Sequence, residues 1–193
     1  MLGATEAPRV FAADELLRQV VEETTGRVHT FSRYTVGVYF GQPGQEAPDP
    51  FFGGEGPART GCHHCGECMT GCRHGAKNTL DRNYLWLAER RGAVIHAETL
   101  VEDLRPRAGG GYQLRTVRST DRLLKRRRTF TARNVVVAGS VLGTVKLLLD
   151  CQRRGSLPDL SPQLGNYVRT NSEALLGAKA RRSDVAYSEG IAI

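Results

Sequence analysis

The sequence predicts an α/β fold, and three observations lead to that prediction. Residues 12–26 place apolar side chains at helical spacing. Strand-like runs follow one another between residues 93 and 132, as in an antiparallel insertion. The short apolar run RNVVVAG at 133–139 then leads directly into a helical pattern, as a strand buried on both faces of a sheet does. Together these features indicate a Rossmann-like α/β domain with an antiparallel β insertion.

Composition is that of an ordinary globular chain. Its 193 residues, 40% apolar and 24% charged, are enough for one domain with a sizeable core. No apolar run is long enough to cross a bilayer, so no transmembrane segment is expected. The N-terminal residues lack the apolar stretch and positive flank of a secretory signal. We therefore expect a cytoplasmic location, where clustered cysteines are more often ligands than disulfides.

The net charge of +7 comes largely from one basic run, Arg122 with Lys125, Arg126, Arg127 and Arg128. Nucleic-acid-binding segments usually interleave such charges with aromatic residues or place them on a reading helix, and neither pattern is present. We therefore expect no nucleic-acid partner and interpret the run as a solvated strand face.

The first part of the chain predicts one helix and one strand before a long loop. The helix over 12–26 has acidic residues in its first turn and ends at Gly26. Its apolar stripe comprises Ala13, Leu16, Leu17, Val20 and Val21. A strand is expected over 33–41, which is rich in β-branched and aromatic residues. Residues 42–77 show no periodicity, and irregular loops of that length are uncommon unless they are functional or tied by a metal.

The second part predicts regular elements in close succession. A helix over 78–92 is expected, with Asn78 or Thr79 as its N-cap. Its inner face comprises Leu80, Tyr84, Leu87 and Ala88. Strands are expected over 93–104, 111–119, 122–132 and 133–139. The last helix follows over 140–151 with Ser140 as its N-cap, and loops are expected from Gly155 onward.

One feature of nucleotide-binding folds is missing. Such folds carry G-x-G-x-x-G between their first strand and helix, where the helix N-terminus holds the phosphates. The chain has no match, and its stretch GGEGP at 53–57 lies inside the irregular loop. The phosphate-binding unit is therefore not in this chain.

Four of the five cysteines lie together, at Cys62, Cys65, Cys68 and Cys72. Their spacing, C-x2-C-x2-C-x3-C, is that of a bacterial ferredoxin run whose thiolates bind iron–sulfur clusters, although Arg73 stands where that run has proline. Zinc is an alternative ligand, because His63, His64 and His74 add nitrogen donors. A third interpretation is a glycine-rich turn in which the thiols simply pack.

Three sequence blocks are specific enough to compare with known families. They are residues 49–93 around the cysteines, residues 133–149 (RNVVVAGSVLGTVKLLL) and residues 164–177 (LGNYVRTNSEALLG), in that order. They closely resemble the glucose–methanol–choline (GMC) family of FAD-dependent oxidoreductases, in its actinobacterial cholesterol-oxidase-like branch. The resemblance implies that the chain is an internal segment of such an enzyme and holds part of an FAD/NAD(P)-binding domain.

The resemblance also implies a division of the chain. Residues 1–41 would lead from the substrate or cap region, and residues 42–77 would form the cysteine-rich loop. Residues 78–150 would be part of the FAD-binding domain with its β-meander. Residues 151–193 would begin the substrate domain, which would be incomplete here.

Cofactor contacts follow from the same resemblance. In the family, backbone atoms of a strand contact the FAD adenine, and Val101 occupies that position. The family's later strand passes close to the cofactor at the equivalent of Ala138, Gly139 and Ser140. Asn171 falls where the family's chain passes the flavin.

The activity implied is oxidation of an alcohol, with a sterol 3-hydroxyl as one candidate and oxygen or a carrier as electron acceptor. The family's catalytic histidine lies in a later block, which His29, His63, His64, His74 and His96 all precede. No catalytic residue is therefore assigned, and the chain alone is expected to be inactive. The alternative function is a small iron–sulfur or zinc protein for electron transfer or binding.

Overall fold

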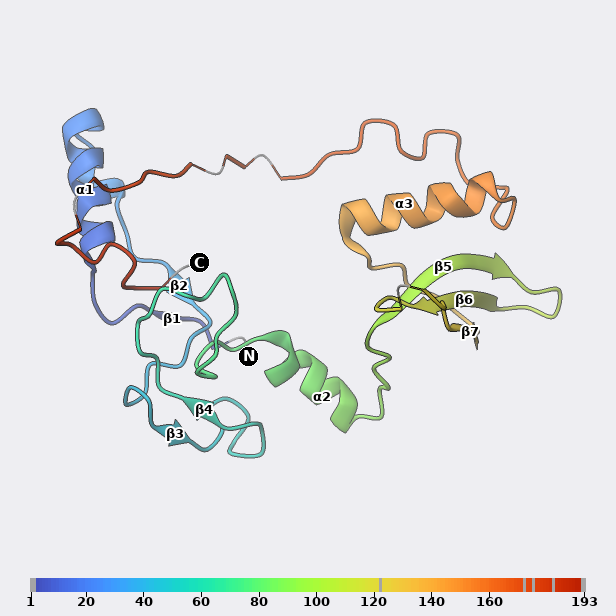
Figure 1. Cartoon of the computed structure of the whole chain (residues 1–193), viewed down its shortest axis with the longest axis horizontal. Helices are drawn as coiled ribbons and strands as arrows, with labels where there is room; N and C mark the ends of the chain where they lie inside the picture. The colour runs from blue at the N-terminus through green and yellow to red at the C-terminus, as the bar shows by residue number, and fades with distance from the viewer. Residues whose placement is uncertain (1–2, 122, 172, 175, 182, 192–193) are drawn as a thin grey trace. The chain divides into compact units, whose positions relative to one another are not determined.

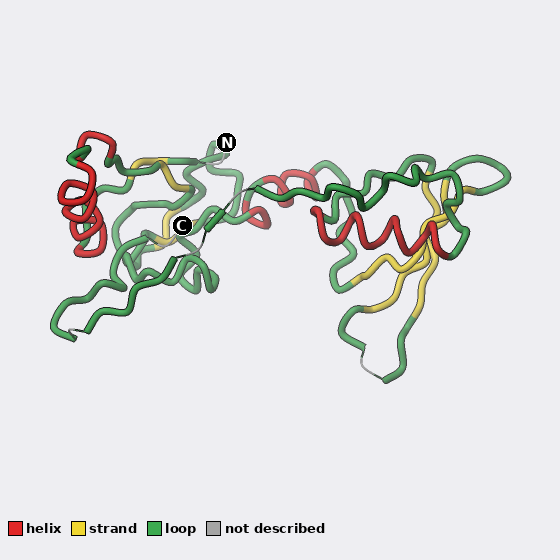
Figure 2. The backbone as a smooth tube through the Cα atoms, turned by 90° about the horizontal axis from the view of Figure 1, so that it is seen from above, coloured by secondary structure: helices red, strands yellow, loops and turns green. Residues whose placement is uncertain are grey.

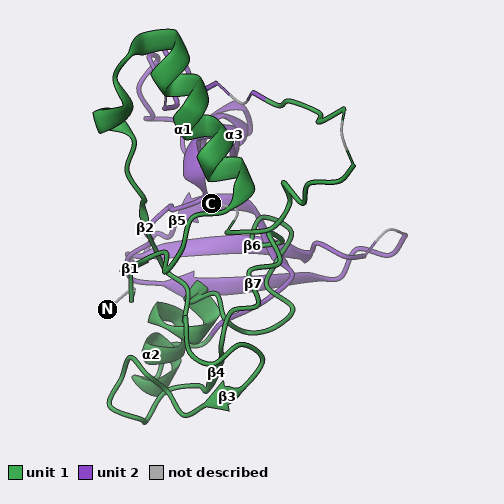
Figure 3. Cartoon of the chain, turned by 90° about the vertical axis from the view of Figure 1, so that its left-hand side faces the viewer, with its two compact units in different colours: residues 1–94, 177–193 green, residues 95–176 purple. Residues whose placement is uncertain are grey.

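The computed structural model describes residues 3–121, 123–171, 173–174, 176–181 and 183–191. The chain divides into two compact units, residues 1–94 with 177–193 and residues 95–176 (Figure 3). Both helices and strands are present, which confirms a mixed fold. Every pairing between named strands is antiparallel in the described residues, so the Rossmann-like sheet is not confirmed.

The first unit opens with β1 (Thr5–Glu6) and α1 (Ala12–Thr25). The Asp14 carboxylate accepts a hydrogen bond from the Phe11 N–H at 2.9 Å, which satisfies a backbone donor at the start of the helix. Gly26 ends the helix in the left-handed conformation, with φ of 63°. The helix predicted from periodicity is therefore confirmed.

Short elements make up the rest of this unit. They are η1 (Val28–Thr30), β2 (Thr35–Val36), β3 (Glu46–Ala47), β4 (Arg59–Thr60), η2 (Leu80–Arg82) and α2 (Tyr84–Arg90). β1 pairs with β2 and β3 with β4. The strand predicted over 33–41 is wrong in extent, because only β2 and an isolated bridge between Val38 and Lys77 form there.

The helix predicted over 78–92 is shorter than expected. It begins at Tyr84, and its N-cap is Asn83, whose side-chain oxygen accepts from the Tyr84 N–H. Asn78 and Thr79 are therefore not the cap. Leu80 and Tyr84 are 56% and 47% exposed, so that half of the predicted inner face is wrong.

The core of the first unit is small. Val38, Cys62 and Ala76 are buried together. Partly buried side chains around them are Val36, Phe40, Cys72 and Ile191. Three residues of the cysteine-rich loop, Cys62, Cys72 and Ala76, thus pack in one apolar cluster with residues that precede the loop and with Ile191.

The second unit is an antiparallel meander covered by one helix (Figure 1). Its strands are β5 (Thr99–Pro106), β6 (Tyr112–Arg118) and β7 (Arg127–Ala132), in the order β5-β6-β7. This confirms the predicted antiparallel insertion, although β5 begins at Thr99 and not at residue 93. α3 (Ser140–Arg153) packs on β5.

The buried strand predicted over 133–139 is absent: these residues form no strand, and Val136 is 88% exposed. A buried parallel strand needs neighbours at both edges and cover on both faces, and the meander provides neither. The N-cap of α3 is Gly139 and not Ser140, which is the first helical residue and has φ of 57°. After α3 the described backbone forms loops (Figure 2).

None of the helices in the described residues combines the length and apolarity that a membrane crossing requires.

Candidate functional site

The loop expected over 42–77 contains the paired strands β3 and β4, and its cysteine-rich part joins β4 to η2. Glycine allows another segment to lie directly against this part. Gly66 has φ of 72°, and a Cβ built there would collide with the Ser188 carbonyl oxygen. The Gly66 N–H donates to the Gly190 carbonyl at 3.1 Å, and the Gly190 N–H donates to the His64 carbonyl at 2.8 Å. The loop is therefore held by backbone contacts that only glycine permits at position 66.

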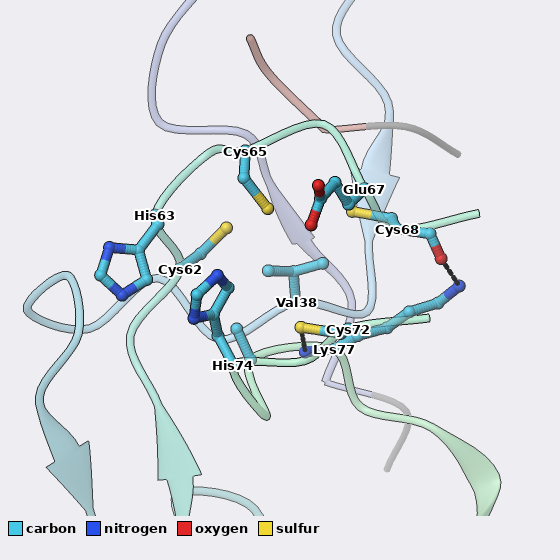
Figure 4. Close-up of a pocket in the computed structure, with 10 residues that line it drawn as sticks. Val38, Cys62, His63, Cys65, Glu67, Cys68, Cys72, His74 and Lys77 are labelled. Atoms are coloured by element: carbon cyan, nitrogen blue, oxygen red, sulfur yellow. Dashed lines mark hydrogen bonds between the residues drawn. The ribbon is translucent and has the colours of Figure 1, made fainter. Parts of the chain in front are cut away.

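The four thiols of this loop line one pocket (Figure 4). Cys62 and Cys68 are buried, Cys72 is half-buried and Cys65 is exposed, and all four are free thiols. Val38 also lines the pocket and belongs to the apolar core with Cys62. The structure thus brings the four predicted residues together around an apolar side chain.

The pKa values of two of the thiols shift in opposite directions. Burial raises the pKa of the Cys62 thiol, although the His64 N–H donates to its sulfur at 3.3 Å. Burial also acts to raise the pKa of Cys72, but backbone N–H groups outweigh burial and lower it. One of these donors is the Lys77 N–H, 3.5 Å from the sulfur. Cys72 therefore forms a thiolate more easily than Cys62.

The pocket does not fit a metal ion or cluster as it stands. Among the described residues, no group of three or more His, Cys, Asp or Glu is placed to hold a metal. The space between the lining side chains is about 10 Å³, room for about one water molecule. The Lys77 ammonium, which donates to the Cys68 carbonyl at 3.0 Å, would also repel a cation. The iron–sulfur and zinc predictions thus gain no support, and the packing interpretation fits.

A buried arginine that the sequence did not single out ties the two ends of the loop together. Arg59 is 0% exposed. Its guanidinium donates to the Asn78 side-chain oxygen at 2.7 Å, to the Arg82 carbonyl at 2.6 Å and to the Pro57 carbonyl at 2.5 Å. The surrounding stretch PARTG has no helical or strand periodicity and no metal-binding or catalytic motif, so the burial of Arg59 is visible only in the folded structure. Arg59 fixes where the loop begins and where it ends.

The predicted cofactor residues all belong to the second unit. Val101 is half-buried on β5, directly before a bulge that separates it from Asp103. Ala138, Gly139 and Ser140 are exposed at the start of α3. Asn171 is exposed in the loop that follows. α3, which begins at Ser140, packs on β5, the strand that carries Val101.

Asp103 is a second buried charge that sequence reasoning missed. Its side chain is 1% exposed and accepts from the Ser156 hydroxyl at 2.5 Å and from the Arg105 guanidinium at 2.5 Å. The fully buried Cys151 thiol lies 3.7 Å from the same carboxylate. The Arg154 guanidinium donates to the Glu102 carbonyl at 2.5 Å, at the bulge itself. The end of α3 therefore holds the strand that carries Val101.

Comparisons with known proteins identify a matching family model and two groups of relatives. Residues 58–152 match the family model of GMC oxidoreductases. A cholesterol oxidase of Acinetobacter baumannii is 45% identical over 202 residues, covering 100% of this chain and 36% of that protein. A cholesterol oxidase of Mycobacterium tuberculosis (strain ATCC 25618 / H37Rv) is 46% identical over 200 residues, covering 100% and 34%. The chain thus spans about a third of the length of the curated relatives it matches. No solved structure matches the chain significantly.

Proposed function

The chain belongs to the GMC oxidoreductase family, and we propose that it is a segment of an FAD-dependent enzyme that oxidises an alcohol. The observation that carries the proposal is similarity to cholesterol oxidases along the whole chain, at 45% and 46% identity. A single shared motif would not give that level of identity over an alignment that covers the whole chain. No observation favours the alternative of a small iron–sulfur or zinc protein.

The second unit has features that fit a cofactor held mainly through backbone atoms. β5 is an edge strand of the described sheet, so backbone groups along its outer side have no strand partner there. Such groups can hydrogen bond a flat heteroaromatic ring without any polar side chain. Val101 and the segment 138–140 are the contacts we propose, with Asn171 as a further one. The phosphates would need the glycine fingerprint that this chain lacks.

When bound, FAD supplies the acceptor for a hydride from the alcohol carbon. This chain would hold part of the cofactor, and the resemblance assigns no catalytic base to any of its histidines. We propose a sterol hydroxyl as the substrate group, since the relatives are named cholesterol oxidases. Oxygen or a carrier would reoxidise the flavin.

The proposal is tested by proline substitution on β5 in the native protein that contains this chain. Val101→Pro removes one backbone N–H and should lower FAD retention about tenfold or more, whereas Val101→Ile should leave it unchanged. Flavin content is measured by absorbance after the protein is denatured. Thr131→Pro on the other edge strand, β7, controls for general damage to the sheet.

Two outcomes would contradict different parts of the proposal. A native protein that binds no FAD would contradict the function itself. A Val101→Pro variant that keeps its full flavin content would place the adenine contact elsewhere.

A further inference from the structure

Two thiols of the cysteine-rich loop, Cys62 and Cys65, are separated by only two residues and line the same pocket. Their sulfur atoms point toward one another (Figure 4). Cys62 is buried and Cys65 is exposed, and both are free thiols. The pair therefore combines a thiol that solvent reaches with a thiol that the apolar core covers.

Backbone hydrogen bonds fix the chain on both sides of this pair. The Cys62 N–H donates to the Tyr39 carbonyl at 3.0 Å. After the pair, the Gly66 N–H donates to the Gly190 carbonyl at 3.1 Å, and the Gly190 N–H donates to the His64 carbonyl at 2.8 Å. Groups held at fixed positions react with each other far more readily than groups free in solution. Rotation of the two side chains is then the main movement needed to join the sulfurs.

The buried member of the pair is held in place by the residues between the two cysteines. The His64 N–H donates to the Cys62 sulfur at 3.3 Å, which keeps that sulfur in the pocket and favours its thiolate. About 10 Å³ remains free among the side chains that line the pocket. A disulfide requires the two sulfurs to approach to about 2 Å.

The other cysteines are placed differently. Cys68 is buried, and Cys72 is half-buried with its sulfur accepting the Lys77 N–H at 3.5 Å. Cys151 lies in the second unit and is 0% exposed. All five cysteines belong to the described residues, and of these five only Cys65 is exposed. A small oxidant from solvent therefore meets Cys65 first.

We propose that Cys62 and Cys65 form a redox-active pair that hydrogen peroxide converts to a disulfide. The Cys65 thiolate attacks one oxygen of peroxide, so an S–O bond forms, the O–O bond breaks and hydroxide leaves. The Cys62 sulfur then attacks the sulfenic acid on Cys65, so the S–S bond forms, the S–O bond breaks and a second hydroxide leaves. The hydroxides take up the protons of the two thiols. The pair loses two electrons, and peroxide becomes two molecules of water.

Hydrogen peroxide is small enough to reach an exposed thiol without a binding site of its own. It is also what oxygen becomes when it accepts two electrons and two protons from a reduced flavin, so an oxidase would release it beside this chain. The pair does not depend on that activity, because peroxide from any source gives the same disulfide.

Mass spectrometry of the full chain tests for the disulfide. The chain is reduced, freed of reductant and exposed to a small molar excess of hydrogen peroxide. Its intact mass should fall by the mass of two hydrogen atoms, and its free thiols, titrated after unfolding, should fall by two from the five of the reduced chain. A dithiol reductant should restore both values.

The position of the disulfide is read from one peptide. Cleavage by trypsin after Arg59 and Arg73 keeps residues 60–73, with all four cysteines of the loop, in a single fragment. Free thiols are alkylated before digestion. The label should then be found on the last two cysteines of this peptide and be absent from the first two.

Serine substitutions separate the pair from the other thiols. Cys65→Ser should abolish the loss of mass, because the thiol that peroxide reaches is gone. Cys62→Ser leaves the sulfenic acid on Cys65 without its partner, so the chain should gain oxygen instead. Cys72→Ser, in the same pocket, and Cys151→Ser, in the second unit, should form the disulfide at the native rate. Circular dichroism checks that each variant keeps its fold.

Several results would overturn the assignment of this pair. A disulfide that includes Cys68 or Cys72 in the native chain would place the reactive thiols elsewhere, and a disulfide between two chains on a non-reducing gel would remove the role of the pocket. Added oxygen without loss of hydrogen in the native chain would show that the two sulfurs do not reach each other. Disulfide formation that persists in Cys65→Ser would contradict its role as the first thiol oxidised.

Discussion

At the scale of single residues, Asp103 is a carboxylate that the second unit buries almost completely. Burial acts to raise its pKa, but hydrogen bonds from Ser156 and Arg105 outweigh burial and lower it. The folded state therefore keeps the side chain charged under conditions where an exposed aspartate would take up a proton. Its contribution to stability is present above the ordinary aspartate pKa of about 3.9 and is lost as pH falls through the lower folded value.

We expect Asp103→Asn to lower the free energy of unfolding by about 2 to 3 kcal/mol at neutral pH, because the charged acceptor of the hydrogen bonds from Arg105 and Ser156 is lost. Chemical denaturation measures the difference. The same change at exposed Asp159 should have almost no effect. The difference between native chain and Asp103→Asn should shrink as pH falls below about 4. A difference that does not change with pH would show that the charge of Asp103 is not what stabilises the fold.

At the scale of elements, local patterns predicted two of the helices and the antiparallel meander well. α1 and α3 follow from apolar spacing within one segment, and the structure places them within a residue or two of the expected bounds. The meander also follows from local alternation. The strand predicted over 133–139 is absent. Its apolar residues alone could not decide whether it forms, because a buried strand also needs neighbouring strands.

The candidate site shows the same limit. The cysteine spacing correctly indicated that Cys62, Cys65, Cys68 and Cys72 share one region, since short spacings keep them close. It could not show that Val38 and Lys77 come from other parts of the chain to line the same pocket. The buried position of Arg59 was not predicted, because its hydrogen-bond partners Asn78 and Arg82 lie on segments that only the fold brings close to it.

Gly66 allows an element-scale prediction about how the segment 188–190 lies on the cysteine loop. Gly66→Ala should lower the unfolding temperature more than Gly53→Ala does. Both glycines have positive φ, of 72° and 71°, so each substitution costs about 1 kcal/mol in backbone strain. Only at Gly66 does the new Cβ also collide with a backbone oxygen, whereas nothing lies within 4 Å at Gly53.

Limited proteolysis provides the second measurement. Cleavage within residues 183–191 should accelerate in Gly66→Ala and stay unchanged in Gly53→Ala, because losing the backbone pairing to Gly190 frees that segment. Equal effects of the two substitutions would mean that strain alone matters and that the close approach of Ser188 does not.

At the scale of the whole molecule, the chain exposes much of its surface. Its accessible area is 14646 Å². Even two compact units folded separately, of the sizes found here, would together expose only about 11,000 Å². The apolar face of α1 illustrates the excess, since Leu16, Leu17 and Val20 are 46%, 56% and 44% exposed. Surface of this kind is available for contacts with further protein or with a cofactor.

Because the chain leaves apolar surface uncovered and spans about a third of the length of its relatives, we expect it to bind FAD weakly by itself. The 193-residue chain alone should bind FAD at least a hundredfold more weakly than a version extended to the length of its relatives, because the glycine fingerprint for the phosphates is absent here. Flavin fluorescence titration gives both dissociation constants. The chain alone should also enhance the fluorescence of the dye ANS more strongly, since its apolar surface is uncovered. Tight FAD binding by the 193 residues would show that the backbone contacts at β5 and the start of α3 are sufficient, and would remove the need for a phosphate-binding unit outside them.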